Sequence, residues 1–203
     1  MAVRLMLAVF FLMIISRVSL VTLNLPSKSN GFQIATGFSI TQVAGTELAS
    51  DIYCITFSPS GDLLASGRGY IKQFSEPNAD GKYQKYCLIA DHPQDGAMGL
   101  LVDKDTLYAV GDGGLRRMPW QPGKYQPTSE ILFSVKTGGE HDAHAIRKGP
   151  DGNFYLLLGN TAANSLKSLN QQMVGGGVLK FSSEFSKAEV ICDGLRNAYD
   201  MDW

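Results

Sequence analysis

From residue 37 onward, short apolar runs alternate with turns built on Gly, Pro and Asp, and no convincing helical stripe appears. Runs of this length, bounded by Gly and Pro, are typical of β-strands. Period-two alternation in Tyr70–Phe74 indicates a strand with one buried face. The pattern therefore predicts an all-β fold.

The apolar runs recur as a unit: a strand, a tight turn, a second strand that ends in glycine, and two further strands. The closing glycines are Gly67, Gly111 and Gly159, which lie 44 and then 48 residues apart. About four strands at a period of about 40 to 50 residues predict the blades of a β-propeller. A β-sandwich with accidental spacing is the alternative. In the first copy the predicted strands are 52–57, 62–67, 70–74 and 86–90, and in the second they are 97–102, 106–111, 114–118 and 130–134. In the third copy a strand precedes the Gly149-Pro-Asp-Gly152 turn, and the strands 154–158, 177–181 and 188–192 follow it.

A fourth copy begins within residues 194–203 and stops before its turn and second strand. Propeller units bury their faces only against neighbouring units, and ring closure protects the sheet edges. The chain is therefore interpreted as an incomplete ring of about three and a half four-stranded blades, a fragment or a truncated reading frame.

The N-terminal segment carries a targeting pattern. Arg4 precedes an apolar run of 11 residues, 5–15. This is the length of a signal-peptide core, whereas a bilayer of about 30 Å takes roughly 20 helical residues. We predict a signal peptide in residues 1–23, with an uncleaved N-terminal anchor as the alternative. A linker is predicted at 24–36 and the partial propeller at 37–203, located in the periplasm or secreted.

Composition excludes several classes of protein. The 18 Lys and Arg residues balance 19 Asp and Glu residues, and no basic stripe indicates nucleic-acid binding. The three cysteines, Cys54, Cys87 and Cys192, are odd in number and form no C-x-x-C pair. They are interpreted as free thiols, not as a disulfide or zinc framework.

Ionisable residues gather just before the first strand of each unit. In a propeller this first strand lines the central channel, and the loops that enter it form one mouth of the channel. The same location recurs four times, which makes it the best candidate for chemistry. These lead-in segments are residues 47–51, 91–97, 140–144 and 193–200.

The lead-in 140–144 reads Glu-His-Asp-Ala-His and supplies two candidate catalytic residues, His141 and His144. A histidine oriented by a flanking carboxylate suits a general base near neutral pH. Residues i and i+3 of a strand point to opposite faces, so the pair predicts two ligands of one metal only if a turn separates them. A structural role is the alternative for each, and His92 is interpreted as an ordinary loop residue.

Arg196 and Asn197 are candidate cofactor-binding residues. The planar guanidinium presents paired donors that suit carboxylates or an anionic cofactor. The alternative is an arginine that holds loop carbonyls. The polar insertion 161–174 either covers the channel rim or is a surface excursion.

His141, the Gly149-Pro-Asp-Gly152 turn and the later Gly194-Leu-Arg-Asn197 resemble the glucose/sorbosone dehydrogenase family. These are six-bladed propeller quinoproteins, exported from the cytoplasm, that oxidise sugars with pyrroloquinoline quinone (PQQ). The export signal is also similar to that of the bacterial membrane-bound dehydrogenase branch. The resemblance covers about residues 37–203 and is strongest from 138 onward.

The resemblance implies a role for each matching residue. His141 matches the general base, and Arg196 and Asn197 match the pair beside the quinone. It also implies a sugar or other alcohol as substrate and an external electron acceptor such as a cytochrome c. Membrane contact is expected only through the N-terminal segment. Calcium and the remaining quinone contacts belong to later blades, so this chain by itself is expected to be inactive.

Two positions depart from the family pattern. Ala198 stands where the family has proline, and His144 has no counterpart in the best-understood glucose oxidisers. A different substrate or role for His144 is therefore open. The leading hypothesis is an exported PQQ-dependent sugar or alcohol dehydrogenase. The alternatives are a calcium-dependent lactonase-type hydrolase and a non-catalytic propeller that binds a glycan or a protein.

Overall fold

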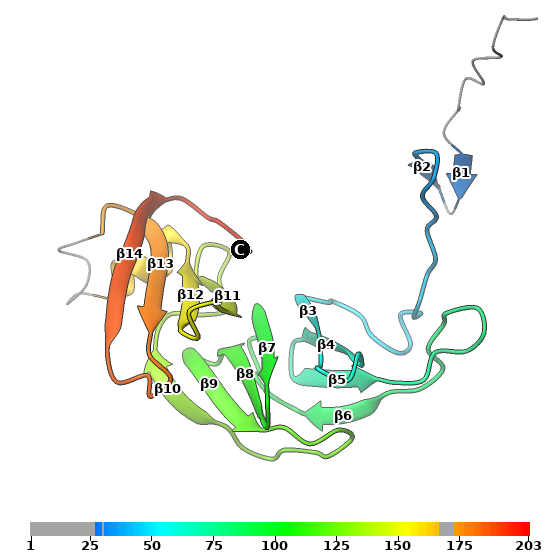
Figure 1. Cartoon of the computed structure of the whole chain (residues 1–203), viewed down its shortest axis with the longest axis horizontal. Coiled ribbons are helices and arrows are strands. Elements are labelled where there is room, and N and C mark those ends of the chain that lie inside the picture. The colour runs from blue at the N-terminus through cyan, green and yellow to red at the C-terminus, as the bar shows by residue number, and fades with distance from the viewer. Residues whose placement is uncertain (1–26, 30, 167–172) are drawn as a thin grey trace, which may run out of the picture. The chain divides into compact units, whose positions relative to one another are not determined.

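The computed structural model describes residues 27–29, 31–166 and 173–203 (Figure 1). The chain divides into two compact units, Met1–Thr41 and Gln42–Trp203. The predicted signal or anchor segment, 1–23, lies outside the described residues. Among the residues that are described, no helix is long and apolar enough to cross a membrane.

The first unit contains a small hairpin in the range predicted as a linker, 24–36. Strand β1 (Ser27–Ser29) pairs antiparallel with β2 (Phe32–Ile34). Gly31 has a φ of 82° in the connection, a conformation that glycine adopts without steric cost. The second unit begins at Gln42.

The second unit contains three four-stranded antiparallel sheets, each built from four consecutive strands (Figure 1). This confirms the all-β prediction and the propeller blades. Blade 1 consists of β3 (Cys54–Phe57), β4 (Leu63–Gly67), β5 (Tyr70–Phe74) and β6 (Cys87–Ala90). Blade 2 consists of β7 (Gly99–Asp103), β8 (Thr106–Gly111), β9 (Gly114–Pro119) and β10 (Glu130–Ser134). Blade 3 consists of β11 (Ala143–Lys148), β12 (Phe154–Leu158), β13 (Gly176–Phe181) and β14 (Ala188–Leu195).

The tight turns fall where Pro, Asp and Gly predict them. In the Gly149-Pro-Asp-Gly152 turn, the Gly152 N–H donates to the Gly149 carbonyl at 3.0 Å. Gly152 has a φ of 80°, and Gly61 in the equivalent turn of blade 1 has a φ of 88°. Left-handed backbone of this kind favours glycine, which explains the residue choice.

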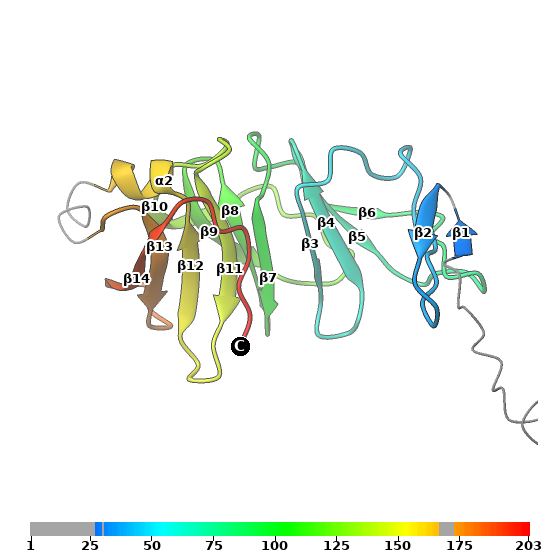
Figure 2. The ribbon, with the colours of Figure 1, turned by 90° about the horizontal axis from the view of Figure 1, so that it is seen from above.

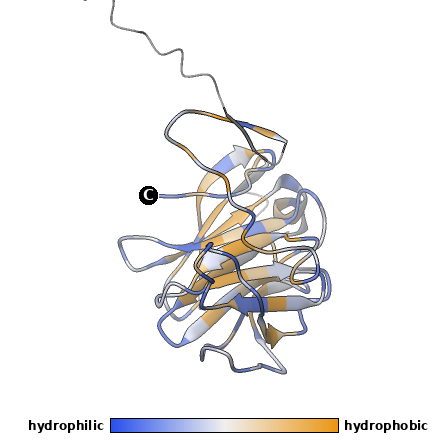
Figure 3. Cartoon of the chain, turned by 90° about the vertical axis from the view of Figure 1, so that its right-hand side faces the viewer, coloured by the Kyte–Doolittle hydropathy of each residue, from blue (hydrophilic) through white to orange (hydrophobic). Residues whose placement is uncertain are grey.

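The hydrophobic cores lie between successive sheets, and β8 shows how. Leu107 and Ala109 are buried in the core shared with blade 1. Tyr108 and Val110 are buried in the core shared with blade 3. Alternate strand residues point to opposite faces, so a sheet covered on both sides needs a continuous apolar strand. Figure 3 shows this distribution, with the hydrophobic colour on the strands and the hydrophilic colour mainly on the loops.

Strands β3, β7 and β11 are the innermost strands of their blades. Strand β7 contacts both β3 and β11, and Figure 2 shows the three side by side. The lead-in segments therefore enter the channel-lining strands, as the repeat predicts. The side chains described below lie around this channel.

The predicted fourth copy does not form a further sheet. Gly194 and Leu195 complete β14, where Leu195 pairs with Gly176. Residues 196–203 contain no strand and run beside β11 (Figure 2). Their contacts to blade 3 include the ring of Trp203 on Tyr155 and a single backbone hydrogen bond from the Asn160 N–H to the Arg196 carbonyl, without a strand ladder. The structure therefore shows three four-stranded blades followed by a terminal segment, in agreement with the predicted incomplete propeller.

The insertion 161–174 begins within a short helix, α2 (Asn160–Ser165). Ala162 and Ala163 are fully buried in the core of blade 3. This part of the insertion packs on the sheet and is not a surface excursion. Residues 167–172 lie outside the described residues.

Candidate functional site

The residue after each closing glycine contacts the chain that enters the same blade. In blade 1, Arg68 Nε donates to the Tyr53 hydroxyl at 2.9 Å. In blade 2, Asp112 Oδ1 accepts the Gln94 N–H at 2.7 Å. In blade 3, Asn160 Oδ1 lies 2.7 Å from His141 Nδ1. No role was predicted for Asn160 from the sequence, although a polar residue follows the closing glycine in each of the three units.

His141 is half-buried and held at its backbone as well as its ring. Its carbonyl accepts N–H groups of Thr161 at 3.0 Å and Ala162 at 3.2 Å, in the first turn of α2. A Cβ atom on Gly159 would lie 2.4 Å from this carbonyl oxygen. Only glycine allows the lead-in segment to approach the end of β12 so closely.

The flanking carboxylates do not orient the histidine ring, contrary to the sequence-based expectation. Asp142 is buried, and its Oδ2 accepts the Gly139 N–H at 2.8 Å. Its Oδ1 lies 3.6 Å from Lys136 Nζ. Glu140 is exposed. The neutral amide of Asn160 orients His141 instead.

His144 is fully buried, and its Nε2 lies 2.8 Å from Asn197 Oδ1. Its ring packs on Tyr199 with 5.0 Å between ring centroids. The strand-face argument against the histidine pair does not apply, because His141 precedes β11 and His144 lies in a β-bulge of β11. The two rings nevertheless bond to different asparagines.

Arg196 joins the site through its backbone. Its carbonyl accepts the Asn160 N–H at 2.9 Å, while its side chain is exposed. Asn197 is tied to His144, as described above. The structure therefore brings His141, His144, Arg196 and Asn197 into one set of contacts, in which Asn160 is the shared partner that links His141 to Arg196.

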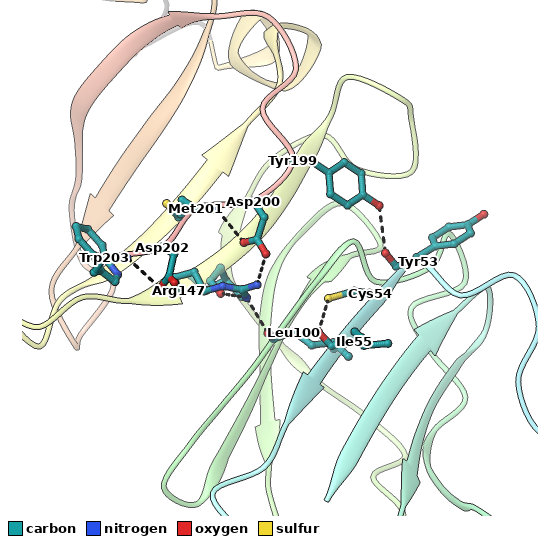
Figure 4. A network of polar contacts seen from close by, with 11 residues as sticks. Tyr53, Cys54, Ile55, Leu100, Arg147, Tyr199, Asp200, Met201, Asp202 and Trp203 are labelled. Atoms are coloured by element: carbon teal, nitrogen blue, oxygen red, sulfur yellow. Dashed lines mark hydrogen bonds and ion pairs between the residues drawn. The ribbon is translucent and has the colours of Figure 1, made fainter. Parts of the chain in front are cut away.

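A cavity of about 190 Å³, lined in part by Tyr199, lies between the inner strands. Asp200 Oδ2 accepts a hydrogen bond from Arg147 Nη2 at 2.6 Å, and Arg147 Nη1 donates to the Leu100 carbonyl of blade 2 at 3.3 Å (Figure 4). The Tyr199 hydroxyl donates to the Tyr53 carbonyl of blade 1 at 3.1 Å. The cavity is lined by Tyr53, Cys54, Ile55, Met98, Ala145, Arg147, Tyr199 and Asp200.

Burial raises the pKa of the Cys54 thiol in this cavity to about 11. A thiol of such high pKa is protonated near neutrality and is a poor nucleophile. All three cysteines are free thiols, in agreement with the interpretation of the sequence.

The polar groups of the blade 2 mouth bond to one another. Asp95 Oδ1 accepts the Asp112 N–H at 2.6 Å, and Asp95 Oδ2 accepts the Thr137 hydroxyl at 2.5 Å. His92 Nδ1 lies 3.4 Å from Asp91 Oδ1. In the part of the chain that the structure describes, no group of three or more His, Cys, Asp or Glu residues is arranged to hold a metal ion.

No protein-family model matches the chain, and a search of the curated proteins finds no match. Solved structures do match. An oxidoreductase of Thermus thermophilus, described as a glucose dehydrogenase, is 22% identical with a TM-score of 0.54, covering 74% of this chain and 54% of its own.

Two further matches are PQQ proteins. The PQQ-bound aldose sugar dehydrogenase of Streptomyces coelicolor is 19% identical with a TM-score of 0.50, covering 67% of this chain and 46% of its own. The PQQ domain of pyranose dehydrogenase from Coprinopsis cinerea is 14% identical with a TM-score of 0.57, covering 73% of this chain and 40% of its own.

The chain thus spans about half the length of the solved structures it matches. At these identities the likeness concerns the fold. It confirms, at that level, the resemblance inferred from His141, the Gly149-Pro-Asp-Gly152 turn and Gly194-Leu-Arg-Asn197. The chain has the β-propeller architecture of the PQQ-dependent sugar dehydrogenases.

Proposed function

We propose that this chain acts in an exported quinoprotein oxidoreductase that oxidises a hydroxyl group of a sugar or other alcohol, with His141 as the general base. The observation that carries the proposal is the hydrogen bond between His141 Nδ1 and Asn160 Oδ1, next to Arg196 and Asn197. The fold shared with PQQ sugar dehydrogenases supports the reaction class.

The Asn160 contact selects the tautomer that a base needs. An amide oxygen accepts hydrogen bonds only, so His141 Nδ1 carries the proton and Nε2 keeps its lone pair. Because His141 is only half-buried, the residue that carries this lone pair is not enclosed in the hydrophobic core. His141 Nε2 would take the proton of the substrate hydroxyl, a contribution of about 10²- to 10⁴-fold in rate.

The donor groups at this mouth fit PQQ, a tricarboxylate quinone whose polar oxygens mostly accept hydrogen bonds. Arg196 has an exposed guanidinium with five N–H donors. Asn197 engages its amide oxygen with His144, which leaves its NH₂ group as a donor. Arg196 and Asn197 would therefore hold the cofactor. When bound, PQQ supplies a hydride acceptor for the carbon that bears the hydroxyl.

Export and electron transfer complete the proposal. The apolar run 5–15 after Arg4 supports export to the periplasm or secretion, with an uncleaved membrane anchor as the variant. Outside the cytoplasm, the electrons would pass to an external acceptor such as a cytochrome c.

Reconstitution with PQQ tests the function directly. The full-length protein that contains this chain is titrated with PQQ while intrinsic fluorescence is followed, and reduction of a dye is then measured with aldoses and simple alcohols. We expect saturable PQQ binding and substrate-dependent dye reduction. Absence of quinone binding would contradict the proposal, and calcium-dependent lactone hydrolysis without an electron acceptor would support a hydrolase instead.

A further inference from the structure

We propose that His144 is a positioning residue that holds Asn197, the neighbour of Arg196, at the channel mouth. The inference rests on the proposed function, in which these two residues hold the cofactor. His144 is fully buried, and its Nε2 contacts Asn197 across 53 residues of sequence. Burial separates this ring from any substrate, whereas His141 is only half-buried.

A β-bulge places His144 where it meets Asn197. Ala143 pairs with Leu158 and Ile146 with Leu156, so three steps along β11 match two steps along β12. The extra residue changes the direction of the side chains in the bulge. The equivalent pair β7 and β8 runs from Gly99 to Asp103 without a register shift. The bulge is thus a feature of the histidine-bearing inner strand and not of every blade.

The hydrogen bond also sets the orientation of the Asn197 amide. Asn197 Oδ1 can only accept, so His144 Nε2 is the donor and the tautomer is Nε2–H. His144 Nδ1 is buried and has no hydrogen-bond partner among the described residues. With Oδ1 directed at His144, the NH₂ group of Asn197 is directed away from it. This is the group proposed to face the cofactor.

Neighbouring contacts show which residues depend on the hydrogen bond between His144 and Asn197 for their position. The ring of His144 packs on Tyr199, and Tyr199 reaches the Tyr53 carbonyl of blade 1. Asp200 binds Arg147 at the far end of the same segment. Residues 199 and 200 are therefore anchored without His144. Arg196 is anchored at its carbonyl by the Asn160 N–H, so Asn197 is the residue that depends on His144 for a side-chain anchor.

Two variants separate the hydrogen bond from the ring. His144→Phe keeps an aromatic ring against Tyr199 and removes the donor. His144→Gln places an amide N–H near the position of Nε2 and removes the ring. His92→Gln is the matched control, because His92 lies in the lead-in segment of blade 2 and bonds only to Asp91 among the described residues.

The experiment measures structure and cofactor binding separately on the full-length protein that contains this chain. Nitrogen-15 NMR of the unmodified protein reads the His144 tautomer and the Asn197 side-chain NH₂ resonances. We expect the Nε2–H tautomer, shifted Asn197 resonances in His144→Phe, and near-native resonances in His144→Gln. PQQ affinity is expected to fall about tenfold in His144→Phe, the effect of one lost hydrogen bond, and to recover in His144→Gln. At saturating PQQ, kcat is expected to stay near the unmodified value in both variants.

Opposite results overturn the inference. An Nδ1–H tautomer in the unmodified protein, or unchanged Asn197 resonances in His144→Phe, would show that His144 does not hold Asn197. Loss of kcat at saturating PQQ in both variants, with unchanged affinity, would make His144 a catalytic residue. If the unmodified protein binds no PQQ, the proposed function fails, while the NMR result still decides whether His144 positions Asn197.

Discussion

In blade 2 the Asp95 carboxylate of the lead-in segment accepts hydrogen bonds from a backbone N–H and a hydroxyl, whereas in blade 3 the two histidine rings contact the side-chain amides of asparagines. Asp95 accepts the Asp112 N–H and the Thr137 hydroxyl. His141 and His144 contact Asn160 and Asn197. The two mouths occupy equivalent places in the repeat. Equivalent polar positions therefore serve loop structure in one blade and assemble a candidate site in the next.

The inner strands differ in the same way. Strand β7 pairs with β8 in regular register, while β11 contains a bulge at its entry. Bulges redirect side chains and are frequent beside active sites. The comparison teaches that the departure from the repeat, and not the repeat itself, marks the site.

The largest expected effect is a difference between His141, at the mouth of blade 3, and His92, at the mouth of blade 2. His141→Ala should lower kcat/KM for PQQ-dependent dye reduction by about 10²- to 10⁴-fold, because the proposed proton acceptor is removed. His92→Ala should leave kcat/KM within about twofold, since the polar contact of the His92 side chain among the described residues is to Asp91 alone. Steady-state kinetics on both variants checks this. Equal losses would remove the functional distinction between the two mouths.

The next effect concerns Cys54, which lines the cavity between the inner strands. Burial raises the pKa of Cys54 from its ordinary value of 9.0 to about 11. At pH 8, Cys54 should therefore be alkylated roughly 100-fold more slowly than an ordinary exposed thiol, since the thiolate is the nucleophile. Iodoacetamide labelling followed by mass spectrometry distinguishes it from the exposed Cys87 and Cys192. Equal labelling of all three cysteines would contradict the burial of the Cys54 thiol.

The same shift has a consequence for stability. The folded-state pKa is raised, so the unfolded thiol ionises first as the pH increases. The contribution of Cys54 to stability is full below about pH 9 and is lost as the pH rises towards 11. Urea unfolding of the native protein and a Cys54→Ala variant across this range measures the difference.

A smaller effect compares the closing glycines. A Cβ atom on Gly159 would lie 2.4 Å from the His141 carbonyl oxygen, and one on Gly111 would lie 2.6 Å from Pro93 side-chain atoms. Each glycine-to-alanine change should destabilise the fold by about 1–3 kcal/mol through overpacking. Gly45→Ala is the control, because the flexible Glu47 side chain can move.

Activity then distinguishes the two closing glycines. Only Gly159→Ala displaces His141, so only this variant should also lower PQQ-dependent activity at a temperature where both variants are folded. An equal loss in Gly111→Ala would indicate that the mouth of blade 2 takes part in the reaction.

The smallest effect probes the bonds of the blade 2 mouth. Asp95→Ala leaves the Asp112 N–H and the Thr137 hydroxyl without their acceptor, at a cost of about 1–3 kcal/mol. Asp95→Asn keeps one oxygen and should cost less. Thermal unfolding measures both changes, and PQQ affinity should be unaltered. Weaker PQQ binding in either variant would contradict a purely structural role.

The strands could be predicted closely because their determinants are local. The bounds of β5, β8, β10 and β12 match the apolar runs, since the flanking turns contain residues that fit positive φ, such as Gly69, Gly113 and Gly152. The end of β14 was not predicted. It extends to Leu195 because β13 offers Gly176 as a partner, and strand pairing is a property of the sheet.

The candidate site was predicted only as a set of residue types. The sequence by itself determined the all-β repeat, the lead-in segments and the presence of His141, His144, Arg196 and Asn197 in them. Only the tertiary structure decided that Asn160 orients His141 and that Asn197 belongs to His144. The physical reason is that a hydrogen bond over 19 or 53 residues depends on sheet register, a bulge and the close approach that Gly159 permits, and no local pattern encodes these.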